Sequence, residues 1–191
     1  MLELLKKNEL ELFKIKSYKK DKVLFMENEI CKEVGFLLKG SLVIKAYTDS
    51  GKEIIYNKIE SGGVFGNNLL FSGNKKYRGN VIAVCDTTIA YINKENLLII
   101  LRNNNAFLNA YLTKLANDSK ELNSKVKLLS LDSAKDRLMY YLDINNNEIK
   151  FNTITSLARE LNIQRETLSR LISKLVKDKV IIYKDNTIKR P

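Results

Sequence analysis

The 191-residue sequence contains no histidine and no tryptophan, one proline and two cysteines. The lack of histidine removes the commonest general base and the usual protein ligand of zinc, non-haem iron and haem. Two cysteines cannot supply a four-thiolate metal or iron–sulfur site within one chain. We therefore predict no metal, no cofactor and no catalytic residue, and we expect Cys31 and Cys85 to be small core residues.

Long apolar runs are also missing. No stretch of some 18 apolar residues occurs, so no transmembrane helix and no membrane partner are expected. The first residues, MLELLKKNELELF, are charged throughout and lack the apolar centre of a signal peptide, which makes a cytoplasmic location the default expectation. The net charge of +11 favours polyanionic partners such as nucleic acid.

Short apolar runs separated by turn residues predict β-strands between residues 20 and 95. The runs are Val23–Met26, Val34–Leu38, Leu42–Tyr47, Glu53–Ile59, Val81–Val84 and Thr88–Ile92. Asp49, Ser50 and Gly51 separate two of them and are typical of a hairpin loop. Strands at this spacing predict an antiparallel β-roll of jelly-roll type.

After Asn93 the apolar residues follow a helical period instead. A short helix is predicted at Leu97–Leu101 and a long one from Asn105 to Leu129. The long helix repeats its stripe residues at steps of four and three: Leu108, Leu112, Leu115, Ser119, Leu122, Val126 and Leu129. A stripe this narrow is typical of paired helices, so we predict a dimer seam. The alternative is a helix that packs only against its own β-roll.

The last 60 residues predict a compact unit of helices with a β-hairpin. Its expected elements are a helix at Ser133–Leu142, a strand at Glu148–Phe151, a helix capped by Thr153 and ended by Asn162, a helix at Gln164–Val176, and a hairpin of Val180–Tyr183 and Thr187–Lys189. Two helices joined by a short turn are typical of the DNA-binding helix-turn-helix.

The second of these helices has one polar face and one apolar face. At about 100° per residue, Leu168, Leu171, Ile172 and Leu175 fall mostly opposite the polar residues. The polar side can be an ordinary solvated face, or it can read bases in the major groove, where Arg binds guanine and Glu accepts from cytosine. We predict base contacts from Arg165, Glu166, Ser169 and Arg170.

Residues 151–191 hold nine Lys and Arg against four Asp and Glu, which suits contact with phosphates. The residues predicted to contact the DNA backbone are Thr153, Gln164, Thr167, Lys174, Lys177 and Lys184.

The stretch RETLSR at residues 165–170 resembles the helix-turn-helix motifs of the Crp/Fnr family of bacterial transcription regulators. SRLISKLVKDKVIIYKDN is similar to the PrfA-like branch of that family. The family's glycine pattern is also found in the stretch LLKGSLVIKAYTDSGKEIIYNKIESGGVFG, at Gly40, Gly51, Gly63 and Gly66. The resemblance implies an α+β fold with a cyclic-nucleotide-binding-like sensor domain at 1–104, a dimerisation helix at 105–131 and a winged helix-turn-helix at 132–191. It further implies a homodimer that reads an inverted repeat with TGTGA- or TTGA-like half-sites in double-stranded DNA, with RNA polymerase as a partner.

The sensor domain departs from the cyclic-nucleotide pattern of the family at two positions. Phe65-Gly66 is followed by Asn67 in place of Glu, and Tyr77 stands where the phosphate-binding Arg is expected, one residue before Arg78. A shift of one residue along a strand reverses side-chain facing, so Arg78 is not a ready substitute. We therefore expect an effector other than cyclic AMP, or none. The residues expected to line an effector pocket are Asn67, Tyr77, Arg78 and Ser119.

Three other functions stay open at this point. One is a cyclic-nucleotide-responsive regulator with an atypical phosphate-binding loop. Another is an enzyme with a metal in a cupin-like β-roll, although such a site normally uses several histidines. The third is a cyclic-nucleotide-responsive module that acts without DNA, like a kinase regulatory subunit. The sequence does not distinguish an activator from a repressor, and it does not name the effector or the target genes.

Overall fold

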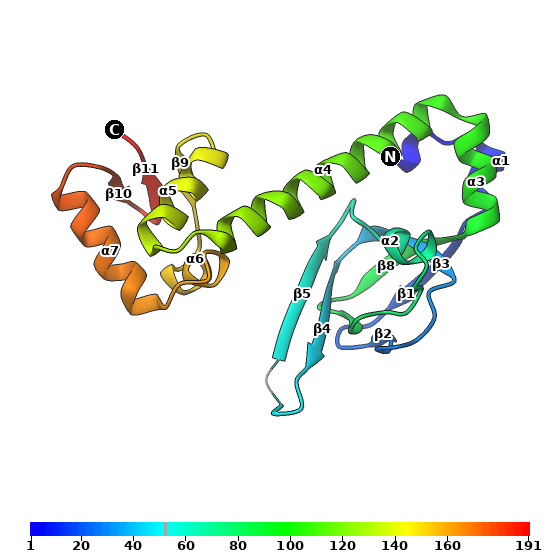
Figure 1. Cartoon of the computed structure of the whole chain (residues 1–191). Coiled ribbons are helices and arrows are strands. Elements are labelled where there is room, and N and C mark those ends of the chain that lie inside the picture. The colour runs from blue at the N-terminus through cyan, green and yellow to red at the C-terminus, as the bar shows by residue number, and fades with distance from the viewer. Residues whose placement is uncertain (52) are drawn as a thin grey trace. The chain divides into compact units, whose positions relative to one another are not determined.

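The computed structural model describes residues 1–51 and 53–191, and it divides into two compact units, Met1–Thr113 and Lys114–Pro191. Lys52, which follows the predicted hairpin loop, lies outside the described residues. The division falls within the long helix α4 (Asn105–Ser130), which is continuous (Figure 1). The first turns of this one helix belong to the first unit and the remaining turns belong to the second.

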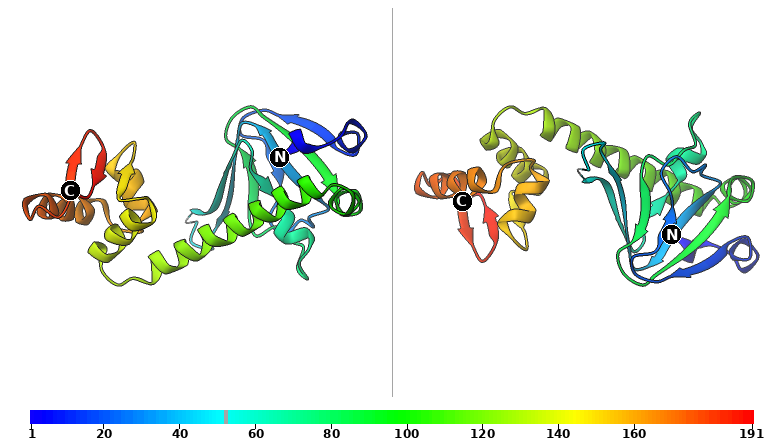
Figure 2. Two further views of the ribbon diagram at one scale, coloured as in Figure 1. Left: turned by 90° about the horizontal axis from the view of Figure 1, so that it is seen from above. Right: turned by 90° about the horizontal axis from the view of Figure 1, so that it is seen from below.

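Two four-stranded antiparallel sheets make up most of the first unit (Figure 2). One has the order β1-β8-β3-β6 and the other β2-β7-β4-β5. The strands are β1 (Lys14–Tyr18), β2 (Val23–Phe25), β3 (Glu33–Lys39), β4 (Ser41–Tyr47), β5 (Glu53–Glu60), β6 (Val64–Phe65), β7 (Asn80–Ala83) and β8 (Thr87–Asn93). The helical elements are η1 (Leu2–Leu4), α1 (Lys7–Leu10), α2 (Asn67–Leu70) and α3 (Lys94–Asn103). All six strands predicted from the apolar runs are present, within one or two residues at each end.

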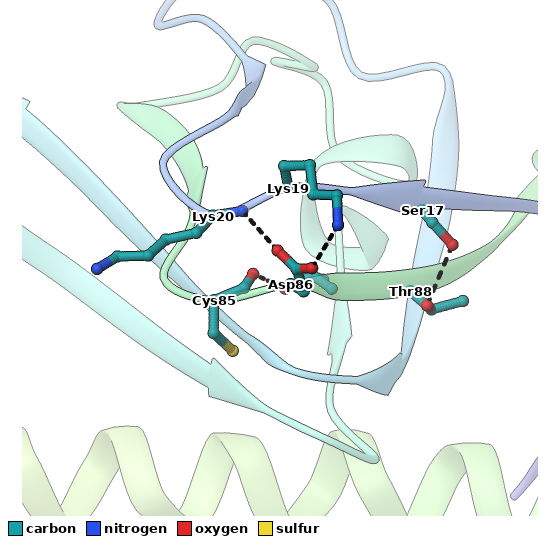
Figure 3. A network of polar contacts seen from close by, with 7 residues as sticks. Ser17, Lys19, Lys20, Cys85, Asp86 and Thr88 are labelled. Carbon is teal, nitrogen blue, oxygen red and sulfur yellow. Dashed lines mark hydrogen bonds and ion pairs between the residues drawn. The ribbon is translucent and has the colours of Figure 1, made fainter.

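The sequence does not predict β1 or the two-residue β6. Four of the five β1 side chains are exposed, so the strand lacks the alternation that marks a half-buried strand. β1 is held by its ladder to β8 and by polar contacts beyond its end (Figure 3). The Asp86 carboxylate accepts hydrogen bonds from Lys19 Nζ at 2.8 Å and from the Lys20 backbone N–H at 3.1 Å.

A buried polar junction ties the N-terminal residues to the start of α4. The Asn104 amide donates to Glu9 Oε2 at 2.9 Å and to the Leu4 carbonyl at 3.0 Å, while its oxygen accepts from Phe107 N at 3.0 Å. The backbone N–H of Lys6 and the Asn104 amide lower the pKa of Glu9, because both donate to its carboxylate. The junction therefore fixes where α4 begins, and the Phe107 side chain is fully buried there.

The second unit has one apolar core beneath three helices and a small sheet. Its elements after α4 are α5 (Ala134–Ile144), β9 (Glu148–Lys150), α6 (Ile154–Glu160), α7 (Arg165–Lys177), β10 (Ile182–Lys184) and β11 (Thr187–Lys189). The sheet order is β10-β11-β9, and the hairpin β10–β11 forms the wing. The first wing strand starts two residues later than predicted, because Ile181 turns into the core and is 2% exposed.

The two cysteines lie in different surroundings. Cys31 is buried as predicted, and its thiol donates to the Glu33 carbonyl at 3.3 Å. Burial raises the pKa of the Cys31 thiol, so it stays protonated and unreactive. The prediction was wrong for Cys85, which is exposed in the turn between β7 and β8. Strand β7 ends at Ala83, so Val84 and Cys85 lie outside the sheet, and both are exposed.

The helices in the described part of the chain include none that is both long enough and apolar enough to cross a membrane.

Candidate nucleic-acid interface

The turn between α6 and α7 has the geometry that the sequence predicts. Thr153 caps α6, since its hydroxyl accepts from the Ser156 backbone N–H at 3.0 Å. Asn162 ends the helix with a left-handed φ of 51°. The Ile163 N–H then bonds back to the Ala158 carbonyl at 2.9 Å, which closes the turn. α7 therefore starts at a fixed point against α6.

Helix α7 separates its two faces as predicted. Leu168, Ile172 and Leu175 are at most 3% exposed and belong to the core of the second unit, while Leu171 is half-buried. The four residues predicted to contact bases are all exposed: Arg165, Glu166, Ser169 and Arg170.

The charged side chains on the exposed face of α7 are not engaged elsewhere in the protein. Within the described residues, Arg165, Glu166 and Arg170 form no ion pair or side-chain hydrogen bond. A solvated surface helix commonly pairs such charges at a spacing of three or four residues. Here Arg165, Glu166 and Arg170 stay available for an external partner.

The residues predicted to contact phosphate surround this face and are all exposed: Thr153, Gln164, Thr167, Lys174, Lys177 and Lys184. Thr153 keeps a hydroxyl proton to donate, because its oxygen is the acceptor in the helix cap. Lys184 ends the first wing strand, and in the same strand Tyr183 stacks on Phe151 with ring centroids 6.1 Å apart.

A hollow of about 330 Å³ lies beside α7, between the helix and the wing. It is lined by Ile154, Ser169, Ile172, Ser173, Val176 and Tyr183. Sequence reasoning missed Ser173 and Tyr183 as neighbours of the interface. Ser173 could have been predicted, because the helical period places it one turn after Ser169. Tyr183 could not, because its place beside α7 depends on how the wing folds.

The predicted dimer seam is an exposed apolar stripe over most of its length. Leu112, Leu122, Val126 and Leu129 are 52%, 62%, 60% and 51% exposed. Ser119 is exposed as well, whereas Leu108 and Leu115 are half-buried. Beside the stripe, in the first turns of α4, Phe107 and Tyr111 are buried in the first unit and lie against Phe36.

The residues predicted to line an effector pocket do not share one environment. Tyr77 is 2% exposed, and its ring stacks on Phe25 at 4.7 Å between centroids. Asn67 is half-buried at the start of α2, and Arg78 is exposed. Ser119 belongs to the second unit, whereas the other three residues belong to the first.

Tyr77, which stands where the resemblance expects a phosphate-binding Arg, is thus a buried aromatic side chain in this structure. Phe25, which stacks on Tyr77, also packs against Phe65 and Tyr91, and the centroids of these three rings lie 6.1–6.4 Å apart. Burial raises the pKa of Tyr77 above its ordinary value, so its phenol stays neutral. A neutral buried phenol cannot replace a guanidinium as the partner of an anion. Tyr77 therefore does not supply the positive charge that the resemblance expects at this position.

Cyclic AMP at millimolar concentration is expected to leave the melting temperature of the protein unchanged. A ligand at a hundred times its dissociation constant stabilises the folded state by about 2.7 kcal/mol, which a melting curve resolves easily. Differential scanning fluorimetry with cyclic AMP, and with 5′-AMP as the matched control, makes this measurement. A rise in melting temperature with cyclic AMP alone would contradict the prediction.

Residues 15–104 match the family model described as "Cyclic nucleotide-binding domain". A search of the curated proteins finds no match to the sequence. The matched residues cover most of the β-roll and end at Asn104, where α4 begins.

Solved structures share the fold over nearly the whole chain. The catabolite activator protein of Thermus thermophilus is 21% identical, with 98% of this chain and 91% of that chain covered and a TM-score of 0.56. A CooA mutant from Carboxydothermus hydrogenoformans is 21% identical over 96% and 85%, with a TM-score of 0.68. The c-di-GMP responsive regulator CLP of Xanthomonas campestris is 18% identical over 95% of each chain, with a TM-score of 0.58. These likenesses confirm the predicted α+β fold class, with an antiparallel β-roll and a C-terminal helix-turn-helix.

Proposed function

We propose that the chain is a Crp/Fnr-type transcription regulator that binds an inverted repeat in double-stranded DNA as a homodimer. The β-roll and helix-turn-helix fold is that of solved regulators of this type. The finer assignment to the PrfA-like branch rests on the sequence of α7 and the wing. RNA polymerase as a partner rests on the resemblance alone.

The observation that carries the proposal is the unpaired polar face of α7. Two arginines and a glutamate stand exposed, without internal partners among the described residues, on a helix whose opposite face is in the core. Positive charge surrounds them, as phosphate contact requires. Neither an enzyme nor a sensor that acts without DNA needs such a face.

We propose that cyclic AMP is not the effector, because Tyr77 stands where the resemblance expects the phosphate-binding Arg. The regulator CLP of Xanthomonas campestris is c-di-GMP responsive, so the fold is not tied to one effector. We propose that the β-roll of this protein responds to a different small molecule or has a purely structural role.

Selection of binding sites from random double-stranded DNA tests the proposed function. The full-length protein is expected to enrich an inverted repeat whose half-site centres lie about 34–36 Å apart, or one helical turn. If Lys174, Lys177 and Lys184 contact phosphates in both protomers, the plot of log K against log salt concentration has a slope of about −5. Enrichment of no sequence, or of one unrepeated half-site, would contradict the proposal.

A further inference from the structure

The Arg137 side chain joins three backbone carbonyls from two separate parts of the second unit. In α5, its Nε donates to the Leu131 carbonyl at 2.8 Å, and its Nη2 reaches the Leu129 carbonyl at 3.4 Å. Its Nη1 donates to the Asn162 carbonyl at 2.8 Å. Leu129 and Leu131 bracket the end of α4, whereas Asn162 is the left-handed residue of the turn before α7.

A guanidinium is the side chain suited to this task. Its donors form a rigid planar fork, so three groups in different directions can be bonded at once. The acceptors are neutral, and among the described residues no carboxylate pairs with Arg137. Charge pairing therefore does not explain its placement, while the connection between two chain segments does.

The last turn of α4 is firmly attached to the second unit. Leu128 is 4% exposed in its core, and Lys127 Nζ lies 4.9 Å from the centre of the Tyr140 ring in α5. Ile163, in the turn before α7, also packs against this core. Among the side-chain hydrogen bonds of the described residues, those of Arg137 link the end of α4 to that turn.

We propose that Arg137 is a positioning residue that couples the end of α4 to the recognition helix α7. The Asn162 carbonyl is two residues before Gln164, which is the N-cap of α7, so fixing this carbonyl fixes the entry into the helix. A displacement of the last turn of α4 moves the Leu129 and Leu131 carbonyls, and the guanidinium passes the displacement to the turn. The proposal rests on the proposed function only in that α7 is taken as the helix that reads DNA.

The test compares Arg137→Met, which keeps an unbranched apolar stem without the donors, with Arg137→Lys, which keeps the charge. Both are expected to bind the selected operator about tenfold more weakly, because the free protein no longer holds α7 in its binding orientation. A single ammonium cannot span the three carbonyls, so Lys is not expected to rescue. The slope of log K against log salt is expected to stay unchanged, because Arg137 contacts no phosphate.

Lys135→Met is the matched control, since it removes an exposed positive charge two residues earlier in α5. Amide hydrogen exchange of the free protein gives a readout that needs no DNA. Exchange of the Ile163 N–H, which donates to the Ala158 carbonyl in the turn, is expected to accelerate in both Arg137 variants and not in the control.

Two results would overturn the coupling. One is parental exchange at the turn in the Lys variant, which keeps the charge and is expected to fold even if the Met variant does not. The other is a salt slope that falls by about one for each protomer, which would make Arg137 a phosphate contact. If the parent selects no DNA sequence, the proposed function fails, whereas the exchange measurement still decides whether Arg137 holds the turn.

Discussion

Arg170→Ala is expected to abolish specific binding while leaving the fold and the proposed dimer intact. A bidentate contact between Arg and guanine contributes about 1–3 kcal/mol of discrimination. A homodimer makes the contact twice, so the loss is about 2–6 kcal/mol, or roughly 30-fold to 10⁴-fold in affinity for the operator. The exposed side chain has no internal partner in the described structure, so its truncation does not remove a contact on which folding depends.

Titration of the selected operator and of a scrambled duplex at one salt concentration measures this effect. The operator affinity of the variant is expected to fall to nearly that of the scrambled duplex. Arg102→Ala is the control, because it removes an exposed arginine from α3 in the first unit. Glu166→Ala adds a finer check, since it should relax base preference at one position of each half-site. Parental footprints for both α7 variants would show that the face has another role.

The elements that the sequence predicts well are those whose periodicity agrees with their burial. In α7, Leu168, Ile172 and Leu175 repeat at helical spacing, and all three reach the core. The Thr153 cap and the left-handed Asn162 follow from local chemistry, which is independent of the rest of the fold. The polar face of α7 could therefore be predicted residue by residue.

What the sequence cannot predict depends on contacts between distant segments. β1 is a strand because β8 supplies its partner and Asp86 holds the turn that follows, not because of its own pattern. Arg137 looks like any charged residue of an amphipathic helix until the Leu131 and Asn162 carbonyls are brought to it. Tyr77 could be recognised as a departure from the family pattern, but its burial against Phe25 could not.

Replacement of two residues in the α4 stripe is expected to convert the protein into a monomer. Leu122 and Val126 are more than half exposed, so in this chain alone their side chains stabilise little. Burial of a Leu or Val side chain is worth about 1.5–3 kcal/mol. Four such side chains in a dimer contribute at most about 6–12 kcal/mol, which is comparable with the free energy of a micromolar complex.

The double variant Leu122→Glu and Val126→Glu places four carboxylates at that contact. The free energy from apolar burial is then lost, and the like charges repel each other. Analytical ultracentrifugation is expected to give a monomer at micromolar concentration, with an unchanged melting temperature for each unit. Specific DNA binding should fall to that of a half-site, since one recognition helix remains in each molecule. Asn117→Glu is the control, because it adds a carboxylate to an exposed position on the opposite side of α4. If the double variant remains a dimer, the two chains pair through a different surface, and the prediction that the α4 stripe is the dimer seam is wrong.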